Sequence, residues 1–323
     1  VLGVYIGTIV LLNIPNIQQA MSVFVAEELS EVLNTKVVIG RINMGLLNRI
    51  IIDDVLLDDQ SGQEMLKVTR LSAKFDIMPF FKGKISISSV QLFGFNINLR
   101  KETPDSPPNF KFVLDAFASK DTVKKENSLD LRINSILIRR GRMSYHVLSE
   151  EETPGKFNAK HIQLQNIIAN ISLKALSKDS LNLGIKRLSL DEKASGFSLK
   201  KMSLKLVANN KQTNIDNFTI ELPETSLKLD TIHLEYDSLK AFDRFTEQVH
   251  FSFRTLPSQV TLKDISPFVP ILSHFKEPVT LDMEVKGTVD QLTCSHLEIT
   301  ADDRQFRLRG DVSLQDLSRP QDA

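Results

Sequence analysis

The feature that most constrains this chain is a recurring alternation of apolar and polar residues between Ile85 and Val285. Leu281-Asp282-Met283-Glu284-Val285 is one example. Alternation with a period of two places apolar side chains on one face of a β-strand and polar side chains on the other. Antiparallel sheet, with one dry and one solvated face, is the usual host of such strands. We therefore expect a mainly β chain with few short helices.

A finer pattern interrupts the alternation. Two apolar residues in alternate positions are followed by a pair of polar residues, and then by two more alternating apolar residues. A one-residue slip would turn the later apolar side chains to the solvated face, unless a bulge or a short break at the pair restores them and bends the sheet. The pattern predicts an elongated, curved antiparallel sheet. The pairs are Ser88-Ser89, Asn134-Ser135, Gln165-Asn166, Lys186-Arg187, Lys200-Lys201, Asp230-Thr231 and Ser295-His296.

The N-terminal residues indicate a membrane anchor followed by a helix. Val1 to Leu12 are apolar or small, but a spanning helix needs roughly 20 such residues. The run is either the end of a transmembrane helix that starts upstream or the core of a signal peptide, and the lack of a small-x-small cleavage site favours the retained anchor. Apolar residues with helical spacing follow. They are Ile17, Met21, Phe24, Val25, Leu29, Val32 and Leu33.

The role of this second helix stays open between packing on a core and lying along a membrane face. Its polar face carries Glu27, Glu28 and Glu31, which argues against electrostatic attraction to an anionic membrane. Shorter helical pieces are expected at Phe110 to Ala118, Ala241 to Gln248 and Pro267 to Phe275.

The domain organisation follows from these elements. A length of 323 residues suits two domains or one elongated repetitive body. We expect the end of a transmembrane anchor in 1–15, an amphipathic helix in 16–35, a first β segment with a closing helix in 36–118, a linker in 119–128, and a continuing β body in 129–323, which reads as a piece of a longer chain.

Composition and motifs exclude several classes of function. Forty basic residues balance forty acidic ones, so the net charge offers no attraction to nucleic acid. The six histidines are scattered, and none is predicted to bind zinc. The acidic run Asp53 to Asp59, followed by Gln60-Ser61-Gly62, is interpreted as a strand ending in a turn with solvated carboxylates. No phosphate-binding loop, dinucleotide fingerprint or serine nucleophile motif occurs, so we predict no catalytic, cofactor or metal residues.

Several segments in order carry a resemblance to a known family. They are Ile14-Pro15-Asn16-Ile17-Gln18, Thr35 to Gly40, Ile52 to Gly62, Ala73 to Ile77, Asn109 to Phe117, and the turn Gly287-Thr288-Val289-Asp290-Gln291-Leu292. Together they resemble the N-terminal region of the TamB proteins, the inner-membrane subunits of the translocation and assembly module, in the AsmA-like superfamily. The resemblance covers most of the chain, although its motifs are degenerate β patterns.

Membership of this family would imply a single-pass protein of the bacterial inner membrane, with most of the chain in the periplasm as a taco-like β-groove. It would also imply partners: phospholipid or another lipid, the inner membrane, and an outer-membrane barrel protein of the assembly machinery. Either lipid transport between the membranes or a scaffold role in outer-membrane protein assembly would follow. The family has no catalytic residues to carry over.

The apolar face would then line a path for lipid, and a closed β core remains the alternative reading of the same residues. A covered apolar path removes the cost of exposing methylenes to water, about 0.8 kcal/mol each. The candidate lining residues are Ile87, Phe93, Phe95, Ile97, Ile133, Leu183, Phe197, Leu199, Leu229, Phe251, Phe253, Leu281 and Met283.

Overall fold

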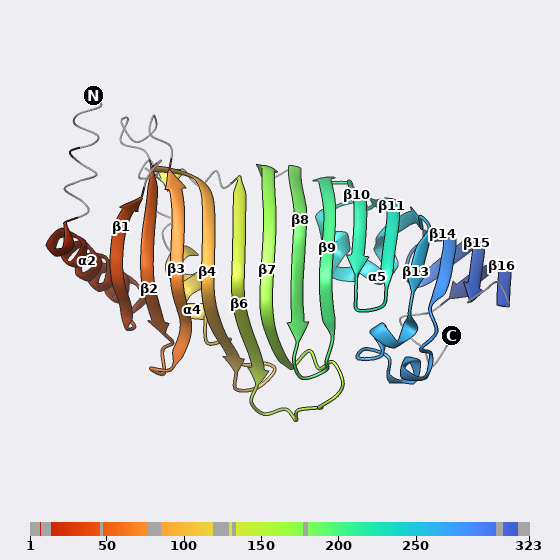
Figure 1. Cartoon of the computed structure of the whole chain (residues 1–323), viewed down its shortest axis with the longest axis horizontal. Helices are drawn as coiled ribbons and strands as arrows, with labels where there is room; N and C mark the ends of the chain where they lie inside the picture. The colour runs from red at the N-terminus through yellow and green to blue at the C-terminus, as the bar shows by residue number, and fades with distance from the viewer. Residues whose placement is uncertain are drawn as a thin grey trace. The chain divides into compact units, whose positions relative to one another are not determined.

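A computed structural model describes residue 7 and residues 14–45, 48–75, 85–118, 129–130, 134–176, 180–301 and 306–315. The chain divides into two compact units. Unit 1 comprises residues 1–168 and 191–195, and unit 2 comprises residues 169–190 and 196–323. Both units consist mainly of β-strands, which confirms the predicted mainly β class (Figure 1).

Unit 1 begins with a helix and continues with a sheet. Its strands are hydrogen-bonded in the order β1-β2-β3-β4-β6-β7, and β5 pairs with β4. Strand β7 starts in unit 1 and ends in unit 2. The elements are α2 (Pro15–Leu33), β1 (Val37–Gly45), β2 (Arg49–Asp58), β3 (Glu64–Phe75), β4 (Ile85–Lys101), α4 (Lys111–Ala118), β5 (Leu129–Asp130), β6 (Ser135–Val147) and β7 (His161–Leu176).

Two strand pairs depart from the predicted antiparallel sheet. β5 runs parallel to β4, with Ile85 paired with Leu129 and Ser86 with Asp130. β4 and β6 run parallel, in register from Ser89 with Ser135 to Lys101 with Val147. A parallel pair needs a crossover connection in place of a tight turn, and α4 lies within that connection. Alternation reports which side chains share a face but not strand direction, so the prediction of an antiparallel sheet was wrong at both of these pairs. Unit 1 therefore contains a mixed sheet.

Unit 2 continues from the end of β7 with strands in the order β8-β9-β10-β11-β12-β14-β15-β16, and β13 pairs with β11 and β14. Neighbouring strands from β9 to β16 pair antiparallel throughout. The elements are β8 (Ser180–Glu192), β9 (Ser198–Asn209), β10 (Gln212–Glu221), β11 (Ser226–Glu235), η2 (Leu239–Arg244), α5 (Phe245–Gln248), β12 (His250–Arg254), β13 (Ser258–Val260), η3 (Leu262–Ile265), η4 (Pro270–His274), β14 (Val279–Gly287), β15 (Gln291–Ala301) and β16 (Phe306–Gln315).

Helix α2 corresponds to the helix expected in 16–35. Pro15 occupies its first turn, where a missing N–H costs nothing, and Asn34 ends it in the left-handed conformation at φ 48°. Only part of its predicted apolar face is buried. Met21, Val25 and Leu33 pack against the sheet, whereas Phe24 and Val32 are exposed. The polar residues Gln18 and Ser22 are buried as well, and the Ser22 hydroxyl donates a 2.8 Å hydrogen bond to the Gln18 carbonyl.

A closed hydrophobic core lies at the start of unit 1. Residues of α2 and α4 pack on the apolar face of β1, β2 and β3 around a buried cluster. The members of that cluster are Leu33, Val37, Ile39, Ile42, Leu57 and Met65. The segment expected to close the first β segment, Phe110 to Ala118, contributes Phe110, Phe112, Val113 and Ala116 to the packing. The apolar face of these first strands is thus covered by helices.

In unit 1, the positions where the alternation shifts by one residue lie side by side on neighbouring strands, in a row that we call the slip row. The register pairs Arg41 with Asp53, Asp53 with Arg70, Arg70 with Phe93, and Phe93 with Arg139. Next to this row, four residues adopt positive φ between 55° and 62°: Asp54 on β2, Gly94 on β4, Arg140 on β6 and Asn166 on β7. A left-handed residue shifts the alternation by one position, so the apolar side chains before and after the row return to the same face.

The predicted polar pairs have different outcomes. Asn166 and His296 have positive φ, and the register shifts at Ser88 and between Cys294 and Leu297, so the bulges predicted at these three pairs are confirmed. The bulge predicted at Lys200-Lys201 has no counterpart in the β9–β10 register, which instead shifts on β10 between Asp216 and Thr219. Lys201 pairs in register with Glu221. The bulge that the β9 sequence predicts can therefore lie on the neighbouring strand.

The predicted anchor lies almost wholly outside the described residues, as do the linker 119–128 and the lining candidate Ile133. Within the described part of the chain, we find no helix with the length and apolar character required to span a bilayer.

The left-handed residues beside the slip row give a first prediction. Asn166 has φ 55°, a conformation that β-branched residues avoid, and its amide donates a 2.7 Å hydrogen bond to Asp191. Asn166→Val should destabilise unit 1 by about 1–3 kcal/mol, whereas Asn166→Gly should cost less because glycine adopts this φ freely. Chemical unfolding of both variants measures the difference. Equal losses would show that the backbone conformation at this row is unimportant.

Close packing at Gly141 gives a second prediction. A Cβ on Gly141 would lie 2.3 Å from the Phe95 ring, which therefore needs a glycine beneath it. Gly141→Ala should destabilise the protein by about 1–3 kcal/mol, and Phe95→Leu in the same chain should recover part of the loss. Gly310→Ala is the matched control because nothing lies within 4 Å of its added Cβ. Thermal unfolding with no recovery in the double variant would contradict this packing.

Candidate functional site

The candidate site is the apolar face of the strands. Of the described lining candidates, Phe95, Leu199 and Leu229 are buried and the others are half-buried, so none of them is fully exposed. In unit 1, Phe95 pairs with Val68, and Ile97 pairs with Leu66 and with Met143 on β6. Paired residues share a face, so the apolar row extends from β3 across β4 to β6.

Phe93 is placed differently from the other candidates on β4. It belongs to the slip row, pairs with Arg70 and Arg139, and lies 6.0 Å from the Arg139 guanidinium carbon in a cation–π contact. Arg70 also forms an ion pair with Asp53 at 2.6 Å. The structure thus groups Phe93 with charged side chains rather than with Phe95 and Ile97.

Unit 2 carries a second stretch of apolar face. Phe251 and Phe253 stack with ring centroids 6.2 Å apart, and Phe253 pairs with Val285. Leu281 pairs with Ile299 on the next strand. Phe197 contacts Phe268 edge to face at 5.0 Å, so the segment before η4 covers this end of β9. Half-buried aromatic and aliphatic side chains therefore extend from β11 to β15.

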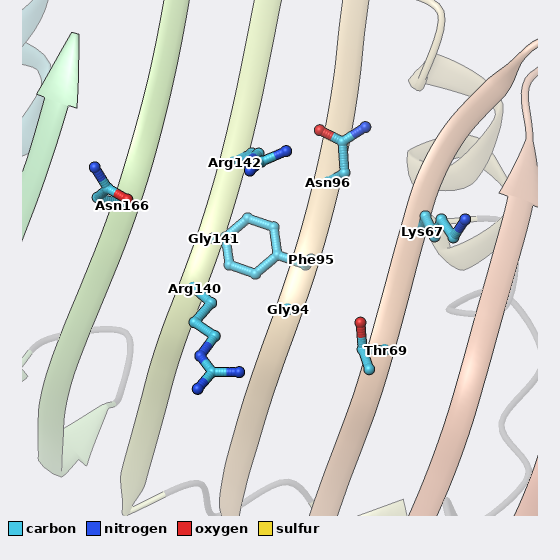
Figure 2. Close-up of a pocket in the computed structure, with 9 residues that line it drawn as sticks. All are labelled: Lys67, Thr69, Gly94, Phe95, Asn96, Arg140, Gly141, Arg142 and Asn166. Atoms are coloured by element: carbon cyan, nitrogen blue, oxygen red, sulfur yellow. The ribbon is translucent and has the colours of Figure 1, made fainter.

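Figure 2 shows a hollow in unit 1 of about 390 Å³, at the slip row. Its lining combines the backbone of Gly94 and Gly141 with the basic residues Lys67, Arg140 and Arg142. Lys67 and Arg142 both pair with Asn96, which places the three side chains on one face of the sheet. At both glycines a neighbouring side chain takes the space of the missing Cβ: an added Cβ would lie 2.7 Å from the Thr69 hydroxyl at Gly94 and 2.3 Å from the Phe95 ring at Gly141. Its lining residues include no carboxylate.

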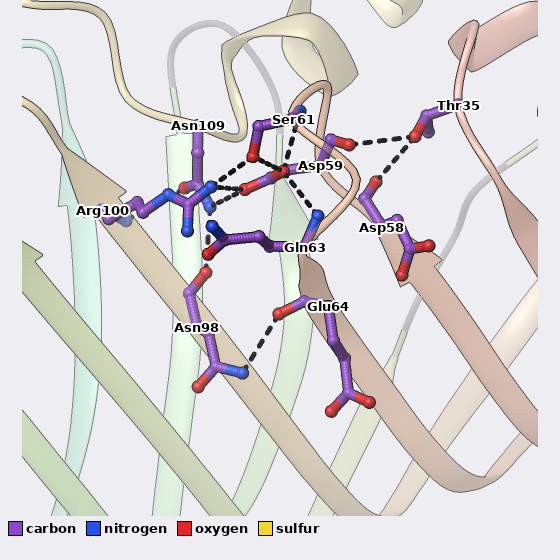
Figure 3. A network of polar contacts seen from close by, with 9 residues as sticks. All are labelled: Thr35, Asp58, Asp59, Ser61, Gln63, Glu64, Asn98, Arg100 and Asn109. Carbon is purple, nitrogen blue, oxygen red and sulfur yellow. Dashed lines mark hydrogen bonds and ion pairs between the residues drawn. The ribbon is translucent and has the colours of Figure 1, made fainter.

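A buried carboxylate organises the turn between β2 and β3 (Figure 3). Asp59, only 2% exposed, accepts hydrogen bonds from the Ser61 N–H at 2.9 Å and hydroxyl at 2.6 Å, and from the Gln63 N–H at 3.1 Å. Its other oxygen accepts from Arg100 at 2.7 Å and from Asn109 at 3.2 Å. The prediction of solvated carboxylates in this acidic run was therefore wrong for Asp59, whose distant partners the local sequence does not reveal.

The hydrogen bonds set the ionisation of this group. Burial acts to raise the pKa of Asp59, but the hydrogen bonds from Ser61, Asn109 and Gln63 outweigh it and hold the pKa below its usual value of 3.8. Glu192 repeats the arrangement at the end of β8 (with Ser195 and the backbone of Gln163 as donors), and its pKa is also lowered against the effect of burial. In each case an ionised carboxylate holds a turn.

The structure also brings together two histidines that the sequence pattern left scattered. His146 at the end of β6 and His161 at the start of β7 approach to 3.0 Å between their Nδ1 atoms. They are separated by 15 residues in the chain, and only the pairing of the two strands makes them neighbours.

Comparison with known proteins adds no assignment, since no family model and no curated protein matches this chain.

The Asp59 network gives a third prediction. Because the folded state lowers the pKa of Asp59, its contribution to stability is complete above the usual aspartate range near pH 4 and is lost as the pH falls through the lowered value. Asp59→Asn should cost about 1–3 kcal/mol at pH 7, since the amide cannot accept the same set of hydrogen bonds. It should also flatten the loss of stability below pH 4. Thermal unfolding from pH 7 to pH 3 measures both effects.

Asp58→Asn is the matched control, because Asp58 engages Thr35 through its backbone carbonyl. An Asp59 variant as stable as the Asp58 variant across this pH range would contradict the role of the buried carboxylate.

Proposed function

We propose that this chain binds the acyl chains of phospholipid or another lipid along its apolar sheet face, as part of lipid transport between the inner and outer membranes. The proposal includes anchorage in the inner membrane with most of the chain in the periplasm, as the resemblance to the TamB proteins implies. No bond-making chemistry is proposed.

The single observation that carries the proposal is the partial burial of the apolar face. Helices cover the first strands of unit 1 and bury Ile39 and Leu57 to below a tenth of their surface. By contrast, Ile97, Leu183, Phe251, Phe253, Leu281 and Met283 remain half-buried. In a closed core, side chains in the middle of strands would be buried as Ile39 is. Apolar surface that stays accessible along several strands is typical of a binding surface.

The energetics suit a lipid ligand. Two acyl chains with roughly 30 methylenes would cost on the order of 24 kcal/mol to expose to water, and contact with apolar side chains removes part of that cost. Half-buried side chains already have partly fixed rotamers, so they lose less conformational entropy on contact with a ligand than freely exposed ones would.

A scaffold for outer-membrane proteins is the second candidate. β16 pairs with β15, and Phe306, Leu308 and Leu314 on β16 are exposed. An exposed strand with apolar side chains can receive a strand of a client protein by β-augmentation. This function would use the edge of the sheet, whereas lipid binding would use its face, so the two candidates predict different contacts.

Photo-crosslinking in cells gives a fourth prediction. A photoreactive phenylalanine analogue at Phe251, Phe253 or Leu281 should capture lipid, because these half-buried side chains lie on the apolar face. The same analogue at Phe75, which is buried, and at Lys200 or Lys228, which are exposed, should capture much less. Mass spectrometry of the purified adducts identifies the captured molecule.

The controls separate the competing functions. Equal lipid capture at Lys200 and Phe251 would show contact with bulk membrane rather than binding on the apolar face. Adducts with outer-membrane proteins at Phe306 or Leu308, without lipid adducts at Phe251, would favour the scaffold. The absence of both kinds of adduct would indicate a closed structural core.

A further inference from the structure

A cluster of potential metal ligands lies at one end of the β6–β7 pair in unit 1. His146 belongs to β6, His161 opens β7, and Glu152 lies in the connection between them. The two Nδ1 atoms are 3.0 Å apart, and His146 Nδ1 is 4.0 Å from a carboxylate oxygen of Glu152. One ligand atom from each of the three residues lies within 4.8 Å of the other two.

The hydrogen bond on the far side of His161 prepares its ring as a ligand. Its Nε2 lies 2.9 Å from the backbone carbonyl of Glu150. Since a carbonyl oxygen only accepts, Nε2 carries the proton, and in the neutral ring Nδ1 then presents a lone pair toward His146. Metal-binding histidines usually donate their other N–H to a carbonyl or carboxylate in this way, which fixes the tautomer and the ring orientation. His161 is itself 6% exposed, so its ring is held in place.

The connection between the strands is ordered around the cluster. The Glu150 N–H donates to the Val147 carbonyl at 3.0 Å, and the Val147 N–H donates to the Lys160 carbonyl at 2.9 Å. Lys160 forms an ion pair with the Glu150 carboxylate at 2.6 Å, so the ammonium group of this connection has its own anionic partner. Glu152 is 62% exposed and remains free to turn toward the histidines.

We propose that His146, His161 and Glu152 bind a divalent transition-metal ion of the zinc class, which fastens the 148–160 connection to the ends of β6 and β7. Two imidazole nitrogens and one carboxylate oxygen are ligands that Zn²⁺ accepts at about 2.0–2.2 Å, with water in the fourth position. At such distances two tetrahedral ligands are about 3.3 Å apart, so the rings separate by only a few tenths of an ångström. Mg²⁺ and Ca²⁺ prefer sets of oxygen ligands and do not suit this site. This site is independent of the lipid-binding face.

Zn²⁺ titration of the metal-free protein tests the site, with affinity measured by competition against a chromophoric chelator. Because Glu152 is exposed, Glu152→Gln should leave the fold intact and is the most informative variant. It should weaken Zn²⁺ binding at least about tenfold, as should His146→Gln and His161→Gln, because loss of a supporting group alone costs 10–100-fold. Glu151→Gln, an exposed neighbour, and His274→Gln, an exposed histidine in unit 2, should bind Zn²⁺ like the parent chain.

Nitrogen NMR of the histidine rings provides a second readout that does not depend on substitution. On addition of Zn²⁺, His161 should show a metal-bound Nδ1 together with a protonated Nε2. Unchanged His146 and His161 resonances, or equal Zn²⁺ affinity in the Glu152→Gln and Glu151→Gln chains, would overturn the proposal and leave the two rings as a hydrogen-bonded pair. Mg²⁺ at the same concentration should change neither signal.

Discussion

Unit 1 depends on keeping the apolar residues of each strand on the same face of the sheet along its whole length. A β-strand exposes alternate residues on opposite faces, so one uncorrected slip would send half of its apolar side chains into water. The chain places its slips on adjacent strands in a common row and corrects several with a left-handed residue, such as Asn166. Neighbouring strands therefore bend at the same place and keep their hydrogen bonds in register. At Gly94 and Gly141 the absence of a side chain leaves room for the neighbouring Thr69 and Phe95, and all four residues line the basic hollow.

The correction keeps an apolar face continuous, but helices do not close all of it. α2 and α4 pack on β1 to β3 and make a conventional core there. Leu183 on β8 and Phe251 on β12, by contrast, stay half-buried. An apolar side chain gains about 25 cal/mol for each Å² that leaves water, so contact between the half-buried strands and an apolar ligand would be favourable. Our proposal of lipid binding depends on this difference between fully and partly covered strands, rather than on the apolar composition alone.

The sequence predicted what depends on neighbouring residues along the chain. Alternation predicted the strands, and the polar pairs predicted the bulges at Ser88, Asn166 and His296, because both are properties of a single strand. The parallel direction of β6 beside β4 could not be predicted in this way, since parallel and antiparallel strands show the same alternation. Nor could the burial of Asp59, whose partners Arg100 and Asn109 are more than forty residues away, or the meeting of His146 and His161. Alternation can also place a bulge on the wrong strand of a pair. The bulge predicted at Lys201 on β9 has its counterpart in the register shift on β10.

Much of the order in unit 1 comes from the ends of its strands. Asp59 and Glu192 each hold a turn with an ionised, hydrogen-bonded carboxylate, and the His146–His161 pair joins the end of β6 to the start of β7. Polar networks of this kind fix strand register where the strands turn. The middle of the sheet then needs less support from side-chain packing, because backbone hydrogen bonds between strands and anchored turns already specify its geometry. A sheet held at its ends can keep part of its apolar face accessible without losing its register, which is the property that a lipid-binding surface requires.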